Sequence, residues 1–184
     1  MELLYSDKFI AVCVKPAGVL STDEPGGAPE LLRAALGDPG AAVFTVHRLD
    51  RVVGGVMLLA RTREAAAALG RQVMDGRFRK AYLADAPGKD AREAISDYTL
   101  LRSAGGLSLL RITLRTGRTH QIRAQFAAHG LPLVGDRKYG TLTDGETPIA
   151  LWSERLAFFH PDTGAALEFS LPPPRTEPWT RFDP

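Results

Sequence analysis

The sequence predicts an α+β fold, in which a mixed, mainly antiparallel β-sheet is flanked by a few helices. Short segments rich in β-branched and aromatic residues recur along the chain, and turn residues rather than long helices separate most of them, which favours antiparallel pairing. Only three segments combine helical apolar spacing with a glycine stop. With 184 residues, 45% of them hydrophobic, we expect a single domain over residues 1–184 whose core needs no disulfide.

The first half of the chain is expected to alternate strands with two short helices. The strands are predicted at residues 3–5, 9–14, 43–46 and 55–60, and the turn Ser6-Asp7-Lys8 joins the first two. One helix is predicted over residues 29–36, because proline suits the first helical turn and Gly37 follows its end. Thr62 is expected to cap a second helix over residues 63–74.

The second half of the chain is expected to be mostly strand. The strands are predicted at residues 78–84, 96–102, 107–115, 133–134, 149–159 and 167–171. Gly105 and Gly106 favour a hairpin turn between the second and third of these strands. One helix is predicted over residues 119–128. The proline-rich tail, residues 172–184, is expected to run extended over the surface.

The segment His47-Arg48-Leu49-Asp50-Arg51 places a carboxylate between two guanidinium groups, just before two glycines and an apolar strand. Asp50, flanked by Arg48 and Arg51, is expected to be ionised and available as a nucleophile or a base. The alternative is a surface aspartate in a turn that pairs with its neighbours. This motif alone does not decide between the two interpretations.

A second segment, Arg115-Thr116-Gly117-Arg118-Thr119-His120-Gln121-Ile122-Arg123, contains arginines and a histidine without an acid. Residues 109–128 as a whole carry no Asp or Glu, and a positive local field favours an anionic partner. Arg118 lies at the predicted helix start, where N–H groups and a cation can bind phosphate. Arg123 lies one turn further, on a face shared with His120. The alternative is an exposed basic helix end that makes surface ion pairs.

Two further side chains are candidates for contacts with a nucleic-acid base. Tyr82, which follows Lys80 on a predicted strand, can stack its ring on a base while its hydroxyl forms a hydrogen bond. The alternative is that Tyr82 packs as an ordinary strand residue. Gln121 can read a base edge or hold a backbone group. Both therefore belong with the arginines in a possible nucleic-acid site.

Composition and the lack of other motifs narrow the function classes. The net charge is only +2, so bulk electrostatics do not indicate nucleic acid. The four histidines lack zinc-like spacing and the single Cys13 has no partner, so no metal site is expected. The sequence contains no phosphate-binding P-loop, dinucleotide fingerprint or Gly-x-Ser-x-Gly elbow. Without a signal peptide or a membrane span, the chain is expected to be cytoplasmic and to have no membrane partner.

The two arginine-bearing segments resemble motifs of the RluA-type RNA pseudouridine synthases. Further blocks occur in the family's order over about residues 15 to 173, namely Lys15-Pro16-Ala17-Gly18, Lys80-Ala81-Tyr82-Leu83-Ala84, Val134-Gly135-Asp136, Tyr139-Gly140, and His160-Pro161 with Thr163-Gly164. The resemblance implies a pseudouridine synthase-like fold with a central RNA-binding cleft. It also implies that uridine in RNA is converted to pseudouridine without a metal or cofactor.

The resemblance further implies roles for the matching side chains. Asp50 matches the essential aspartate, which attacks the sugar at C1′ or removes a proton from C2′, and both options stay open. Tyr82 matches the tyrosine that stacks on the target base, and Arg123 matches the arginine that pairs with the aspartate. Arg48 matches a residue that fills the gap left by the extruded uridine. Contacts with RNA are expected from Arg48, Arg51, Lys15, Arg118, His120 and Gln121.

Two features distinguish the chain from the family pattern. Val53-Gly54 stands where the family usually has Thr-Ser, which removes two hydroxyl groups from the loop of Asp50. The chain also starts directly on the catalytic core, so we expect no amino-terminal RNA-binding domain. Recognition by the core alone favours a compact stem-loop of ribosomal or transfer RNA, and nothing in the sequence demands more than a monomer.

Two alternatives to an RNA-modifying enzyme stay open at this stage. One is a non-catalytic RNA-binding or RNA-folding module on the same scaffold, which Val53-Gly54 favours and the joint presence of Asp50, Tyr82 and Arg123 disfavours. The other is an enzyme that uses Asp50 as a base on a small molecule. That enzyme would act on free nucleotides, and its binding would not depend on salt.

Overall fold

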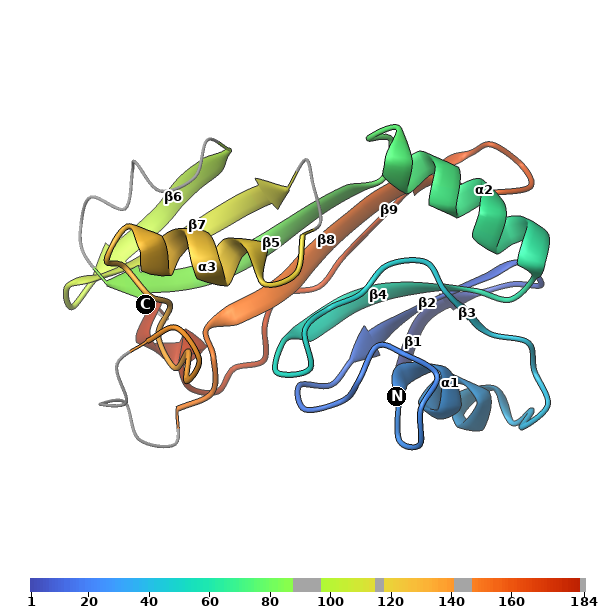
Figure 1. Cartoon of the computed structure of the whole chain (residues 1–184), viewed down its shortest axis with the longest axis horizontal. Helices are drawn as coiled ribbons and strands as arrows, with labels where there is room; N and C mark the ends of the chain where they lie inside the picture. Colours follow the sequence, from blue (N-terminus) through green and yellow to red (C-terminus); the bar gives the residue numbers. More distant parts are fainter. Residues whose placement is uncertain (88–96, 115–117, 141–146, 183–184) are drawn as a thin grey trace. The chain divides into compact units, whose positions relative to one another are not determined.

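The computed structural model describes residues 1–87, 97–114, 118–140 and 147–182 (Figure 1). The chain divides into two compact units: unit 1 comprises Met1–Lys80 and Ser153–Leu171, and unit 2 comprises Ala81–Trp152 and Pro172–Pro184. Within the described residues, the elements are mainly antiparallel strands with a few short helices, which confirms the predicted α+β class.

Unit 1 is built on a β-sheet. Its neighbouring strands are β1 (Glu2–Ser6), β2 (Ile10–Lys15), β4 (Gly54–Ala60) and β8 (Leu151–Phe159), with β3 (Phe44–Thr45) paired to β4 and β9 (Ala166–Ser170) paired to β8. The β1–β2, β2–β4, β3–β4 and β8–β9 pairs are antiparallel. All of β4 is buried, and Cys13 of β2 lies opposite Met57. The loop that precedes β4, which carries Asp50, is thus attached to an interior strand.

The two helices of unit 1 begin and end within one residue of the predicted bounds. They are α1 (Ala28–Leu36) and α2 (Arg63–Met74). Thr62 caps α2 as expected, because its side-chain oxygen accepts a hydrogen bond from the Ala65 N–H at 3.1 Å. The core of the unit is formed by buried side chains of β2, β4, α2, β8 and the residues before β5, namely Ile10, Val12, Val56, Leu58, Ala60, Ala65, Leu69, Phe78, Leu156 and Phe158.

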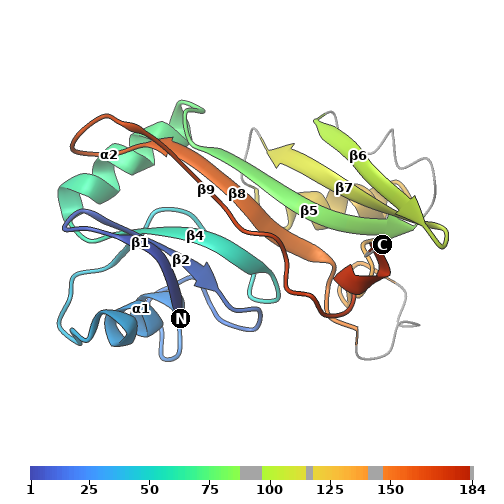
Figure 2. The same cartoon turned by 180° about the vertical axis from the view of Figure 1, so that it is seen from behind.

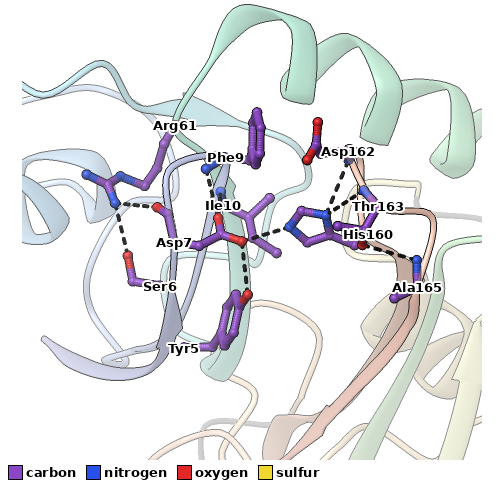
Figure 3. Close-up of polar contacts among 10 residues, drawn as sticks. All are labelled: Tyr5, Ser6, Asp7, Phe9, Ile10, Arg61, His160, Asp162, Thr163 and Ala165. Carbon is purple, nitrogen blue, oxygen red and sulfur yellow. Dashed lines mark hydrogen bonds and ion pairs between the residues drawn. The ribbon is translucent and has the colours of Figure 1, made fainter.

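A part-buried hydrogen bond between His160 and Asp7 ties the β1–β2 turn to the β8–β9 turn (Figure 3). His160 Nδ1 accepts the N–H groups of Asp162 and Thr163 at 3.3 and 3.1 Å, so its ring proton lies on Nε2 and faces Asp7 Oδ2 at 2.8 Å. The Tyr5 hydroxyl donates to the same carboxylate oxygen at 2.9 Å. Side chains far apart in the sequence therefore hold the two hairpins of unit 1 together.

The strands of unit 2 follow the order β5-β7-β6. Its elements are β5 (Arg79–Pro87), β6 (Tyr98–Ala104), β7 (Leu107–Leu114), α3 (Gln121–Ala128) and the 3₁₀ helix η3 (Trp179–Phe182). β6 and β7 form the predicted hairpin, with positive φ at Gly105 and Gly106. The helix α3 lies in front of these strands in Figure 1 and behind them in Figure 2, so it covers one of their faces.

Three predictions for unit 2 were wrong. α3 begins at Gln121 rather than Thr119, because His120 adopts a left-handed backbone, φ 54°, that a helix cannot include. Residues 133–134 form no strand, although the Val134 N–H donates to the Asp85 carbonyl and its own carbonyl accepts from Ala150. The tail is not extended throughout, because it includes η3, where the Arg102 guanidinium donates to the Phe182 carbonyl.

In the part of the chain that the structure describes, no helix has the length and apolar character needed to cross a bilayer.

Candidate active site

Asp50 lies in the loop between β3 and β4, where burial alternates along the motif. His47 and Leu49 are buried, whereas Arg48 and Arg51 are exposed and Asp50 is half-buried. The loop therefore leaves the carboxylate and both guanidinium groups accessible, while His47 and Leu49 face the core.

His47 attaches this loop to β4. Its Nε2 accepts the Leu58 N–H at 3.0 Å, and its ring lies 5.1 Å from the ring of Phe78. Burial, with a smaller contribution from the charge of Lys80, lowers the pKa of His47 to about 3. The imidazole is therefore neutral at physiological pH and acts as a fixed acceptor.

The position of Lys15 does not fit the expected contact with RNA. Its side chain is fully buried, and its ammonium donates to the carbonyls of Pro16 at 2.9 Å, Val19 at 2.6 Å and Arg51 at 3.3 Å. Burial lowers the pKa of Lys15 to about 8, and the nearby charge of Asp50 opposes that shift. Because all three N–H groups of the ammonium are used internally, Lys15 supports the loop instead of facing a ligand.

The turn after Lys15 holds the chain on the carboxyl-terminal side of Asp50. The Gly18 N–H donates to the Arg51 carbonyl at 2.7 Å, and Arg51 Nε donates to the Gly18 carbonyl at 3.0 Å. The Val53 N–H closes the loop on the Asp50 carbonyl at 3.0 Å. Hydrogen bonds thus join the Lys-Pro-Ala-Gly block to the aspartate motif, although the two are far apart in the sequence.

The glycine that follows the motif allows β4 to approach β8. A Cβ atom on Gly55 would lie 2.6 Å from the Ser153 nitrogen and closer still to its carbonyl oxygen, and its φ of 123° disfavours any other residue. The Ser153 hydroxyl donates to the Val56 carbonyl at 2.9 Å beside this contact. Glycine at this position is therefore a requirement of packing.

Unit 2 contributes a buried ion pair centred on Arg123. Its Nε and Nη2 donate to the two carboxylate oxygens of Asp136 at 2.8 and 2.7 Å. Burial by itself would raise the pKa of Asp136, but the guanidinium and the N–H groups of Lys138 and Tyr139 hold it below the usual value. This bidentate contact with Asp136 fixes the plane and direction of the Arg123 side chain.

Tyr139 brings the helix start and this ion pair together. Its ring centroid lies 5.4 Å from the Arg123 guanidinium carbon, and its hydroxyl lies 3.1 Å from His120 Nδ1. Arg118 is exposed, and its N–H donates to the Gln121 side-chain oxygen at 3.2 Å. The second arginine-bearing segment is therefore a folded cluster at the start of α3, and its residues 115–117 lie outside the described residues.

Two polar side chains of β5 are buried in unit 2. Tyr82 is 6% exposed, and Asp85 is fully buried. Within the described residues, neither carboxylate oxygen of Asp85 has a hydrogen-bond partner. Burial raises the pKa of Asp85 to about 7, while the charge of Arg181 opposes this shift and that of Glu177 adds to it. Asp85 was not identified from the sequence.

The structure groups the predicted site residues in two sets. Asp50, Arg48, Arg51 and Lys15 belong to unit 1, and Tyr82, Arg118, His120, Gln121 and Arg123 belong to unit 2. The expected pairing of Arg123 with Asp50 joins the two units and stays a prediction. Sequence reasoning did not assign roles to Asp136 and Tyr139, although both lie in blocks that resemble the family.

Comparison with known proteins identifies relatives along nearly the whole chain. The family model described as RNA pseudouridylate synthase matches residues 9–128. The ribosomal large subunit pseudouridine synthase D of Xanthomonas campestris pv. campestris is 33% identical over 95% of this chain, which spans 66% of that relative. The tRNA pseudouridine synthase C of Haemophilus influenzae is 28% identical over 89% of each protein.

A solved structure supports the fold. The human protein RNA Pseudouridylate Synthase Domain Containing 1 superposes with a TM-score of 0.75 at 24% sequence identity. The superposition covers 95% of this chain and 84% of the human chain. This likeness shows a shared fold, in agreement with the family match.

Proposed function

The chain belongs to the RNA pseudouridylate synthase family, and we propose that it converts uridine to pseudouridine in structured RNA. The observation that carries the proposal is the geometry of the Asp50 loop. The half-buried carboxylate of Asp50 lies between two exposed arginines. Hydrogen bonds to the Arg51 carbonyl hold the backbone next to the aspartate. This arrangement offers one fixed reactive oxygen pair beside cations that can bind phosphate.

The proposed reaction needs only side chains. The bond between C1′ and N1 breaks, the uracil turns, and a bond between C1′ and C5 forms. C5 loses its proton and N1 gains one, so atoms balance and there is no net oxidation. Asp50 either attacks C1′ or removes a proton from C2′, and both options stay open.

The remaining site residues have proposed roles that follow from the family motifs. Tyr82 stacks on the target base from β5. Arg123 pairs with Asp50, and the bidentate contact with Asp136 orients the Arg123 side chain. Arg48, which is exposed, fills the gap that the extruded uridine leaves. The cost of extruding the base is roughly a few kcal/mol, and stacking and phosphate contacts offset it.

The proposed substrate is a stem-loop of ribosomal or transfer RNA. Two relatives are named for activity on ribosomal and transfer RNA. Arg51 and Arg118 are exposed and available for phosphates, while His120 and Gln121 contribute from the start of α3. We further propose that the two units act as one catalytic domain, as a monomer in the cytoplasm.

The direct test uses RNA that carries tritium on C5 of its uridines. Because C5 loses its hydrogen in the reaction, the purified protein is expected to release tritium to water from ribosomal or transfer RNA in buffer with a chelator and no added cofactor. Mapping pseudouridines in cells with and without the gene then identifies the sites. Binding of RNA with no release from either class of RNA would favour a non-catalytic RNA-binding module instead.

A further inference from the structure

We propose that the hydroxyl of Ser21 is a positioning group for Asp50, an inference that rests on the proposed function. Ser21 is 4% exposed and lies in unit 1. Its hydroxyl donates to the Leu49 carbonyl at 2.8 Å and accepts the Leu49 N–H at 3.0 Å. One side chain therefore satisfies both backbone groups of the residue that immediately precedes the catalytic aspartate.

Ser21 is itself attached to regular structure. Its carbonyl accepts the Thr45 hydroxyl of β3 at 3.0 Å, and the carbonyl of the preceding Leu20 accepts the N–H of Ala28, the first residue of α1, at 2.8 Å. A strand and a helix thus fix the hydroxyl in space. Movement of Leu49 relative to the body of unit 1 would break both of its bonds to Ser21.

The same segment also holds the other side of Asp50. The Arg51 carbonyl accepts from Lys15 and Gly18, so residues 15–21 fix the backbone both before and after the aspartate. No serine or threonine occurs between Thr45 and Gly55, and Val53-Gly54 offers no hydroxyl. The side-chain hydroxyl that braces this loop therefore comes from Ser21. Catalysis depends on this bracing, because a displacement of about 1 Å can cost roughly 10²-fold in rate.

Gln72 provides a matched control in the same unit. Its amide donates to the Phe159 carbonyl at 2.7 Å and accepts the Phe159 N–H at 2.8 Å, and the side chain is 5% exposed. Gln72 thus makes the same two-way contact with one backbone residue at the end of β8. Ser21→Ala and Gln72→Met each remove two hydrogen bonds to one backbone residue, and each is expected to lower the midpoint of thermal unfolding.

The experiment compares kcat, KM and amide hydrogen exchange for the two variants and the wild type. Ser21→Ala is expected to lower kcat by about 10- to 100-fold with KM within about twofold, whereas Gln72→Met keeps kcat within about twofold. In Ser21→Ala the exchange of the Leu49 amide should accelerate, and in Gln72→Met that of Phe159 should. Thr45→Val, which loosens Ser21 indirectly, is expected to give a smaller loss of kcat.

Two results would overturn the proposal: a loss of kcat in Ser21→Ala no larger than in Gln72→Met, or a Leu49 amide whose exchange is unchanged. The exchange measurement does not depend on activity. A wild-type protein that converts no uridine but shows the accelerated Leu49 exchange in Ser21→Ala would therefore count against the proposed function and leave the contact between Ser21 and Leu49 established.

Discussion

At the scale of single residues, side chains that look equivalent in the sequence differ in how deeply the fold buries them. Lys15 and Arg51 are both cations of motifs that resemble the family, yet the first is fully buried against three carbonyls and the second is exposed. The sequence predicted the chemistry of these residues but not their direction, because the acceptors that turn Lys15 inward come together only in the fold. Asp136 was missed for the same reason, because its contact with Arg123 forms only in the fold.

Asp85 provides a prediction on pH dependence. Its folded-state pKa of about 7 is raised above the usual 3.8, so its contribution to stability is fully present below about pH 4 and is lost as the pH rises through 7. Asp85→Asn cannot titrate. In chemical denaturation, the free energy of unfolding of the variant should therefore rise relative to that of the wild type between pH 4 and pH 8, by on the order of 3–4 kcal/mol.

A second substitution separates titration from the shape of the side chain. Asp85→Leu also lacks a titrating group, so its difference from the wild type should follow the same trend with pH, whatever its absolute stability. A difference in the free energy of unfolding that stays constant from pH 4 to pH 8 for both variants would contradict the assignment.

At the scale of elements, local signals predicted most boundaries and long-range contacts decided the exceptions. The Thr62 cap and the Gly37 stop act within one turn of the chain, so sequence reasoning located α1 and α2 within a residue. The start of α3 depends on the left-handed His120, whose ring contacts Tyr139 from a distant segment. No local pattern encodes that contact.

The close approach of β4 and β8 gives a prediction at this scale. Gly55→Ala is expected to lower the free energy of unfolding by roughly 1–3 kcal/mol or more, because the new Cβ meets the Ser153 backbone at a positive φ. Gly70→Ala in α2 is the matched control, since a Cβ there meets nothing within 4 Å and alanine favours a helix by up to about 1 kcal/mol. Thermal unfolding should thus shift in opposite directions, and equal shifts would contradict the packing role of Gly55.

At the scale of the whole molecule, the ordered motifs predicted the family and the fold class, which the comparisons and the structure confirm. The division of the chain into two compact units could not be predicted, because β5 and β8 each run through both and carry no composition break. The roles of the candidate site residues stay predictions. Their pairing across the units depends on tertiary placement, which no motif specifies.

The proposed RNA partner implies a salt-dependent affinity. Each exposed arginine that neutralises a phosphate contributes about 0.7–0.9 to the slope of log affinity against log salt concentration. Arg118→Ala is expected to lower that slope by about one unit. Arg33→Ala removes the same charge from an ion pair with Asp23 and should leave the slope unchanged. Equal slopes for all three proteins would remove Arg118 from the proposed RNA interface.

The most direct measurement of the central claim is single-turnover conversion of C5-tritiated RNA by Asp50→Asn, with RNA affinity measured in parallel. If Asp50 is the catalytic group, the rate falls by about 10³-fold or more while the dissociation constant stays within about threefold. Asp38→Asn, which removes an exposed carboxylate of the same unit, should keep the wild-type rate. An Asp50→Asn protein that converts uridine at the wild-type rate would contradict the account.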